Sequence, residues 1–185
     1  MFDSANIVMR KEGLIANSDK RDRRPTKEEL WKLSRYFNTK KSPYLHIMWF
    51  AIFSARRLSE ICKIQWGDIN ENNHTILIRD MKSPNKKTLN LRGKIPLPAY
   101  KLIMRQPKTS DYIFPYNPRT ISTMFSRSCK ILGIEDLHFH DLRREACSRL
   151  ASQGLAIDEI AMISLHQDWK SLQVYHKPDP GNLDI

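Results

Sequence analysis

The chain has 185 residues, of which 31 are Lys or Arg and 20 are Asp or Glu, so its formal net charge is +11. This length supports one hydrophobic core but not two, which predicts a single folded domain. The positive charge favours a polyanionic partner, usually nucleic acid, because each neutralised phosphate releases counterions. A high positive charge can also serve solubility alone, so charge by itself does not establish nucleic-acid binding. Particular residues are needed to distinguish the two interpretations.

The cysteines and the hydropathy pattern exclude several classes of protein. Cys62, Cys129 and Cys147 are widely spaced and include no Cys-x-x-Cys, so neither a disulfide framework nor a zinc knuckle is indicated. Cys62 and Cys147 fall in apolar helical patterns and are expected in the core. No apolar stretch approaches the roughly 18 residues of a membrane span, and the N-terminus lacks a signal-peptide core. We therefore expect a cytoplasmic protein without a membrane partner.

The first part of the chain divides into an arm and the start of a domain. Residues 1–25 mix polar and basic side chains without a sustained period, which predicts an arm or linker. The folded domain is expected over residues 26–185. Thr26 and Glu29 have the spacing of a capping box, followed by apolar residues at helical spacing, which predicts a helix over about 27–37.

The remaining pattern predicts a mainly α fold with a small antiparallel β-sheet, an α+β arrangement. The sheet is expected between about 68 and 97, with a strand at 75–78, a turn at 83–87 and a closing strand at 94–97. Gly133 and Gly154 stand where helices are expected to end. Further helices are predicted over residues 44–54, 58–64, 99–105, 120–132, 141–153 and 157–164, with a short one spanning Tyr175.

Two pairs of residues have the chemistry needed to bind a phosphodiester. Arginine suits this anion because its guanidinium is always charged and binds two oxygens at once. Arg57 and Glu60 are three residues apart, so they share one helix face and the carboxylate can hold the guanidinium. His140 and Arg143 have the same spacing at a predicted helix start, where backbone N–H groups also favour a phosphate. Each pair alone is a weak signal, since Arg-x-x-Glu is usually a surface ion pair.

The order of the motifs carries more weight than any one of them. An Arg-x-x-Glu follows an apolar helix, then come a hairpin bearing Lys, a His-x-x-Arg that opens a helix, and His166 with Tyr175 nine residues further on. Alone, His166 indicates a surface or core histidine and Tyr175 indicates packing. Together these residues predict attack on a phosphodiester by the Tyr175 hydroxyl.

In these residues the chain resembles the tyrosine recombinases, or phage integrase family, over about residues 26–180. Segment 54–62 and the residues after it resemble the family's first motif, with Arg57 as its arginine. Arg56 is the rival, and Arg57 is preferred because it places Glu60 at the third position. Segment 137–144 resembles the second motif. The matched residues after the first motif are then His140, Arg143, His166 and Tyr175.

The resemblance also implies a catalytic lysine on the turn between two strands, which we assign to Lys82 with Lys86 and Lys87 as rivals. DNA backbone contacts are assigned only from charge and position, and a solvated basic face explains those residues about as well. They are Lys86, Lys87, Arg119 and Arg127.

Two positions depart from the family pattern. Many members have Gly where this chain has Leu165, directly before His166, and Thr-Gly where it has Ser54 and Ala55. Neither position carries chemistry, but both could alter loop geometry near the site.

The resemblance implies the reaction of a site-specific DNA recombinase or integrase. Tyr175 attacks the scissile phosphorus and leaves a 3′-phosphotyrosine and a free 5′-hydroxyl. His140 accepts or relays the phenol proton, Lys82 protonates the leaving oxygen, and Glu60 holds an arginine. The non-bridging oxygens are stabilised by Arg57, Arg143 and His166. No ATP, metal or other cofactor is expected, and His138 and His140 face different ways, so no zinc site is indicated.

The expected partner is double-stranded DNA in a bacterial or phage-infected cell, where the protein would be associated with the nucleoid. The resemblance implies a homotetramer on DNA and permits accessory DNA-bending proteins. It also implies an N-terminal domain that closes a clamp on DNA, so this chain is expected to be a catalytic fragment or a natural truncation. The alternatives are a type IB topoisomerase-like enzyme and a basic DNA-binding regulator without catalysis, while an inactive relative keeps the same motifs.

Overall fold

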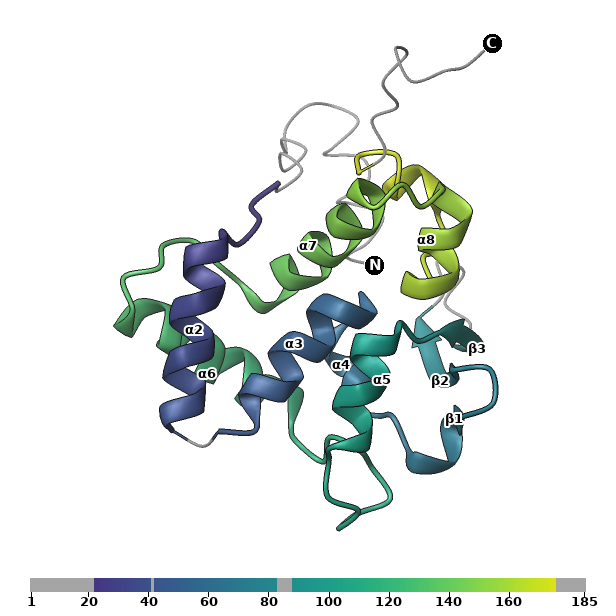
Figure 1. Cartoon of the computed structure of the whole chain (residues 1–185), viewed down its shortest axis with the longest axis horizontal. Coiled ribbons are helices and arrows are strands. Elements are labelled where there is room, and N and C mark those ends of the chain that lie inside the picture. The colour runs from purple at the N-terminus through teal and green to yellow at the C-terminus, as the bar shows by residue number, and fades with distance from the viewer. Residues whose placement is uncertain (1–21, 41, 83–87, 176–185) are drawn as a thin grey trace, which may run out of the picture.

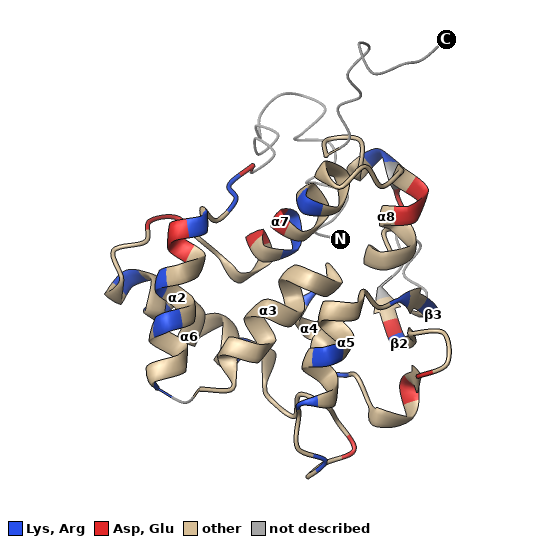
Figure 2. Cartoon of the chain, in the orientation of Figure 1, with Lys and Arg blue, Asp and Glu red and all other residues tan. Residues whose placement is uncertain are grey.

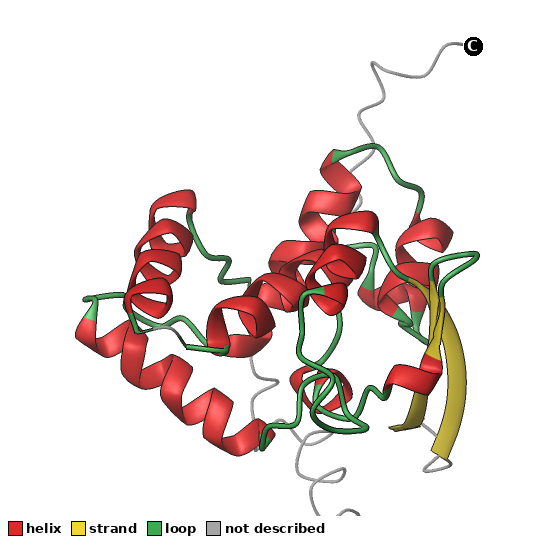
Figure 3. Cartoon of the chain, turned by 60° about the horizontal axis from the view of Figure 1, so that its bottom comes forward, coloured by secondary structure: helices red, strands yellow, loops and turns green. Residues whose placement is uncertain are grey.

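The computed structural model describes residues 22–40, 42–82 and 88–175. Helices form most of the body, and a small sheet lies at one end of it (Figures 1 and 3). The helices are α2 (Lys27–Thr39), α3 (Tyr44–Ser54), α4 (Leu58–Ile61), α5 (Leu97–Met104), α6 (Pro118–Ile131), α7 (Phe139–Ser152) and α8 (Ile157–Ser164), with 3-10 turns η1 (Trp66–Asp68) and η2 (Trp169–Ser171). The strands are β1 (Ile69–Asn70), β2 (Thr75–Lys82) and β3 (Thr88–Lys94). The predicted α+β class is confirmed.

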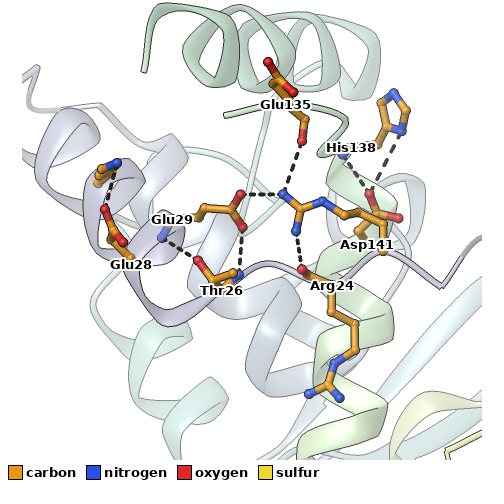
Figure 4. Close-up of polar contacts among 9 residues, drawn as sticks. Arg24, Thr26, Glu28, Glu29, Glu135, His138 and Asp141 are labelled. Atoms are coloured by element: carbon orange, nitrogen blue, oxygen red, sulfur yellow. Dashed lines mark hydrogen bonds and ion pairs between the residues drawn. The ribbon is translucent and has the colours of Figure 1, made fainter. Parts of the chain in front are cut away.

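Helix α2 begins with the predicted capping box. The Thr26 hydroxyl accepts a hydrogen bond from the Glu29 N–H at 3.1 Å, and the Glu29 carboxylate accepts one from the Thr26 N–H at 2.7 Å (Figure 4). These two bonds satisfy donors that the start of a helix leaves unpaired. Leu30, Leu33 and Phe37 then follow on the buried face, as their spacing predicts.

The sheet is antiparallel, in the order β1-β2-β3. Its last strand differs from the prediction, because β3 ends at Lys94 and the expected strand over 94–97 is wrong. Pro96 has no N–H to donate to a strand ladder, and Leu97 already begins α5. The strand that pairs with β2 comes from residues nearer the turn.

The start of α7 is fixed by a second cap. His138 is the N-cap residue, and its N–H donates to the Asp141 carboxylate at 2.8 Å (Figure 4). The helix therefore begins at Phe139, two residues before the predicted start, and His140 lies in its first turn. Burial is complete for Asp141, so the cap also holds the helix end in the core.

The prediction makes one short helix too long and places another where the structure has only a turn. Helix α4 ends at Ile61, because the chain turns at Gln65, whose N–H donates to the Asp68 carboxylate at 3.1 Å. The short helix expected across Tyr175 is wrong within the described residues. Turn η2 ends at Ser171, and the Tyr175 N–H donates to the Leu172 carbonyl at 2.9 Å, which closes a turn of four residues.

The apolar residues form two buried clusters. The larger one joins α2, α3 and α4 to the sheet, to α5 and α6 and to the start of α7, and the smaller one joins α7 and α8 to Ala55 and Leu172. Cys62 belongs to the larger and Cys147 to the smaller, as predicted. Helix α3 contacts both α5 and α7, and α8 contacts α7 and β3 (Figure 1). The end of α3 therefore lies where the two clusters meet.

Each departure from the family pattern includes a residue with left-handed backbone. Ala55, after α3, and Leu165, after α8, each have a φ of 53°. This conformation costs an L-residue roughly 1–2 kcal/mol, which is why glycine is common at helix ends. The predicted glycine caps follow the same geometry, with a φ of 64° at Gly133 and 85° at Gly154. Leu165 directly precedes His166, and Ala55 lies two residues before Arg57.

Candidate active site

Arg57 and Glu60 form the pair that their spacing predicts. Nη1 of Arg57 lies 2.8 Å from Oε1 of Glu60, and the Arg57 N–H donates to Oε2 at 3.1 Å. The Glu60 side chain is 8% exposed and that of Arg57 is 43% exposed. A buried carboxylate thus holds a guanidinium that stays open to solvent.

Arg143 lies on α7 and is almost fully buried. Its Nη1 donates to the Ala55 carbonyl at 2.7 Å and lies 3.8 Å from Oε2 of Glu60. Burial, and next the charge of Arg57, lower the pKa of Arg143 to about 10. This guanidinium therefore remains charged at neutral pH. Glu60 lies between the two arginines of the predicted site.

His166, which directly follows Leu165, is the third member of the cluster and contacts Arg143. Nη2 of Arg143 lies 3.2 Å from its Nδ1 and 3.1 Å from its Nε2. Burial, followed by the charges of Arg143 and Arg57, lowers the pKa of His166 to about 3. The ring is therefore neutral at neutral pH, and it acts as a hydrogen-bonding group and not as a cation.

Ser164 is a neighbour of this ring that the motif analysis missed. Its Oγ lies 2.7 Å from Nδ1 of His166, with the donor set by the tautomer. Ser164 is fully buried at the last residue of α8. The Ser-x-His spacing was visible in the sequence, but only the left-handed turn at Leu165 brings the two side chains together.

The depressed pKa of His166 predicts acid sensitivity. The unfolded ring takes up a proton near its ordinary pKa of about 6.5, whereas the folded ring resists protonation down to about 3. His166 therefore contributes stability above pH 6.5 that is lost as the pH falls towards 3, at up to about 1.4 kcal/mol per pH unit. Urea unfolding between pH 7 and 4 should show a smaller loss in His166→Gln than in the unmodified chain. Equal losses would contradict the assignment.

His140 lies beside the cluster on the exposed surface of α7. Partial desolvation, then the charges of Arg143 and Arg144, lower its pKa below the ordinary value. An unprotonated ring is available to accept a proton at neutral pH. His140 also contributes to the field that acts on His166.

Tyr175 is half-buried against the smaller apolar cluster. Burial, and next the neighbouring Cys147, raise its pKa, while the charges of Arg144, Arg143 and Arg24 oppose the rise. The phenol is therefore protonated at neutral pH and needs a base before it can attack. Neither Arg144, at the end of the second motif segment, nor Arg24, in the expected arm, was given a role from the sequence.

The segment before α2 is joined to the domain through ion pairs. Nε of Arg24 lies 2.9 Å from the Glu145 carboxylate on α7, and Arg23 pairs with Glu29 and donates to the Glu135 carbonyl at 3.2 Å. Residues 1–21 of the predicted arm lie outside the described residues. Arg23 and Arg24, from the same expected arm, are held against the domain.

The predicted lysine and the DNA contacts are only partly covered by the structure. Lys82 is the last residue of β2, paired with Thr88 of β3. Its side chain, like Lys86 and Lys87, lies outside what the structure describes. Arg119 and Arg127 are exposed on α6, which lies behind α2 on the side away from α8 (Figure 1). Lys and Arg also mark α2, α5, α7 and β3 (Figure 2).

The described ranges contain neither a metal cluster nor a membrane-spanning helix. There, no group of three or more His, Cys, Asp and Glu residues is placed to hold a metal ion. Over the same residues, no helix has the length and apolarity to cross a bilayer.

Glu60 is expected to matter through its charge. Glu60→Gln keeps the size of the side chain but removes the only carboxylate between Arg57 and Arg143 among the described residues. Leaving two guanidinium groups without it should lower the free energy of unfolding by about 1–3 kcal/mol. Urea unfolding measures this, with Glu28→Gln as the control because Glu28 pairs with Lys32 on the surface. Equal effects of the two changes would contradict the expectation.

The fold is that of the catalytic domain of tyrosine recombinases. A lambda integrase dimer bound to a COC′ core site matches with a TM-score of 0.69, at 17% identity, over 98% of this chain and 58% of that one. The Tn1549 transposon integrase in complex with circular intermediate DNA also matches at 0.69, with 13% identity, over 91% and 65%. XerA recombinase matches at 0.65, with 17% identity, over 90% and 62%.

Sequence comparison gives the family. The model of the phage integrase family matches residues 23–181, and the chain belongs to this family, the tyrosine recombinases. It is 32% identical over 160 residues to the shufflon-specific DNA recombinase of Escherichia coli, covering 85% of this chain and 41% of the relative. A putative integrase/recombinase of Haemophilus influenzae is 30% identical over 135 residues, covering 72% and 44%. The chain thus spans less than half the length of these curated relatives.

Proposed function

We propose that this chain is the catalytic domain of a site-specific DNA recombinase that cuts and rejoins strands through a 3′-phosphotyrosine on Tyr175. The observation that carries the proposal is a cluster in which Glu60 lies between Arg57 and Arg143, and Arg143 contacts His166. Arg143 and Tyr175 also lie close enough to act on each other's pKa. The family match and the recombinase relatives favour this function over a topoisomerase or a regulator without catalysis.

In the first step the Tyr175 oxygen forms a bond to phosphorus as the bond to the 5′-oxygen breaks. The phenol proton passes to His140, whose lowered pKa leaves it free to accept one. The leaving 5′-oxygen takes a proton from Lys82. Rejoining runs the same steps in reverse, with a 5′-hydroxyl attacking the phosphotyrosine.

Charge builds on the two non-bridging oxygens during this step, and the cluster is suited to stabilise it. Arg57 and Arg143 contribute cations, of which the first is open to solvent and the second is buried. In a partly buried site such preorganised donors act more strongly than in water. His166 is neutral, so its contribution is a hydrogen bond to the phosphate or to Arg143.

The energy of the broken phosphodiester stays in the phosphotyrosine, so the proposal includes independence from ATP. It also includes independence from metal, since arginines supply the positive charge. The partner is double-stranded DNA, and the proposal extends to a homotetramer on DNA with accessory DNA-bending proteins and to a place at the nucleoid. Phosphate contacts position a protein while base contacts specify its site, so this cluster alone selects no sequence.

The test is a suicide substrate, a nicked duplex that loses a short strand after cleavage and traps the covalent complex. Incubation with EDTA and without ATP should give a protein–DNA adduct on a denaturing gel. Mass spectrometry of the digested adduct should place the nucleotide on Tyr175. An adduct on another residue, or one that requires added metal, would contradict the proposal.

A further inference from the structure

Arg56 is a buried cation that the proposed chemistry does not use. It lies in the three-residue connector between α3 and α4, and only 2% of it is exposed. Among the described residues, its Nη1 and Nη2 have no hydrogen-bond partner. A buried guanidinium without such partners is costly, and an apolar side chain of similar size would avoid that cost. Its presence therefore calls for a role other than packing.

The guanidinium of Arg56 is seated between the sheet and the end of α8. A Cβ at Gly93 of β3 would overlap Nη2 of Arg56. The same Cβ would lie 3.0 Å from the Met162 carbonyl oxygen and 3.1 Å from Cδ2 of Leu165. Gly93 does not have left-handed backbone, so it is needed for space and not for conformation. Arg56 thus borders the last turn of α8, whose carbonyl end favours a cation.

The residues on either side of Arg56 in the connector both contact residues of the site. The Ala55 carbonyl accepts from Arg143, and Arg57 pairs with Glu60. On the other side, Leu165 is followed at once by His166. Arg56 therefore stands between the part of the chain that holds the two arginines and the part that holds the histidine.

We infer that Arg56 is a positioning residue, whose buried charge fixes the connector against Gly93 and the carbonyl end of α8 and so sets His166 relative to Arg57 and Arg143. This inference rests on the proposed strand cleavage. It adds a fourth basic residue to the cluster of Arg57, Arg143 and His166, one that touches no DNA. The charge also opposes protonation of His166, together with Arg143, Arg57 and His140, and the Arg143 contact needs a neutral ring.

The charge of Arg56 can be separated from its volume. Arg56→Met fills most of the same space without charge, and Arg56→Lys keeps a charge. The Met variant should be as stable as the unmodified chain or more stable, yet cleave the suicide substrate about 10–100-fold more slowly in a single turnover, since small misplacements of reacting groups cost rate. The Lys variant should regain part of that loss. A residue that only packs would lose stability and rate together.

Gly93→Ala gives a second, independent variant. It should slow cleavage by displacing Arg56, and it should add less in a chain that already carries Arg56→Met, where the closest overlap is removed and the contacts with the Met162 carbonyl and Leu165 remain. Full additivity of the two changes would overturn the inference. So would a Met variant that cleaves at the unmodified rate, or a Lys variant no faster than the Met variant.

A measurement without DNA separates this inference from the proposed function. NMR titration of the His166 ring should show a higher pKa in Arg56→Met than in the unmodified chain, with Arg56→Lys close to the unmodified value. If the unmodified chain forms no adduct, the proposed function fails, and the titration alone then tests whether Arg56 positions His166. An identical His166 titration in all three chains would overturn the positioning role.

Discussion

Replacing Tyr175 with Phe is expected to abolish the covalent adduct while leaving the fold intact. The ring keeps its packing against Cys147 and Leu172, and the hydroxyl makes no hydrogen bond to the described residues. Removing it should therefore change the free energy of unfolding by less than about 1 kcal/mol. The rate of adduct formation should fall by at least about a thousandfold, because the phenol oxygen is the attacking atom.

The suicide-substrate gel and urea unfolding measure these two effects on the same preparation. Tyr116→Phe is a matched control, since Tyr116 is 38% exposed in the loop before α6. It should leave the adduct at the unmodified level. A Tyr175→Phe chain that still forms the adduct would exclude Tyr175 as nucleophile.

Arg143→Lys is expected to produce the second largest loss. The guanidinium contacts three groups at once, the Ala55 carbonyl, Glu60 and His166. An ammonium group cannot reach all of them, because it is compact and lacks the planar fork of arginine. Cleavage should slow by about 10²–10³-fold. The free energy of unfolding should fall by about 1–3 kcal/mol, since buried acceptors lose their donors.

Arg149→Lys provides the comparison on the same helix. Arg149 is 43% exposed, and its Nε lies 3.5 Å from the Glu145 carboxylate, which also pairs with Arg24 at 2.9 Å. Its replacement should therefore leave both rate and stability nearly unchanged. Single-turnover cleavage and urea unfolding of the two variants test the difference. Similar losses in both would show that α7 tolerates no change of this kind and that the buried contacts of Arg143 have no special role.

Local chemistry explains the elements that were predictable. The capping box of Thr26 and Glu29 involves only four consecutive residues. The left-handed glycines after α6 and α7, Gly133 and Gly154, are equally local signals of a helix end. The pairing of Arg57 with Glu60 is equally local, because helix geometry alone brings residues three apart together. Such features depend on near neighbours, which the sequence places without any tertiary contact.

Errors in the prediction fall where distant parts of the chain compete for the same residues. The closing strand was placed at 94–97, because an apolar run with Pro96 does not show which backbone groups β2 will pair with. The turn around Tyr175 was taken as helix, although packing against the smaller cluster holds it with a single turn. In both cases the structure depends on a contact with a distant part of the chain, and the hydrophobic period of the local sequence carries no information about that contact.

By itself the sequence determined the family, the order of the motif residues and the local pairs. Only the tertiary structure decided how they meet: left-handed turns at Ala55 and Leu165 bring the end of α3 and the end of α8 beside Arg143. It also decided that His166 is neutral and that Arg56 is buried beneath Gly93. The physical reason is that burial and long-range charge depend on which segments pack together, whereas caps and helical spacings depend only on the nearest residues.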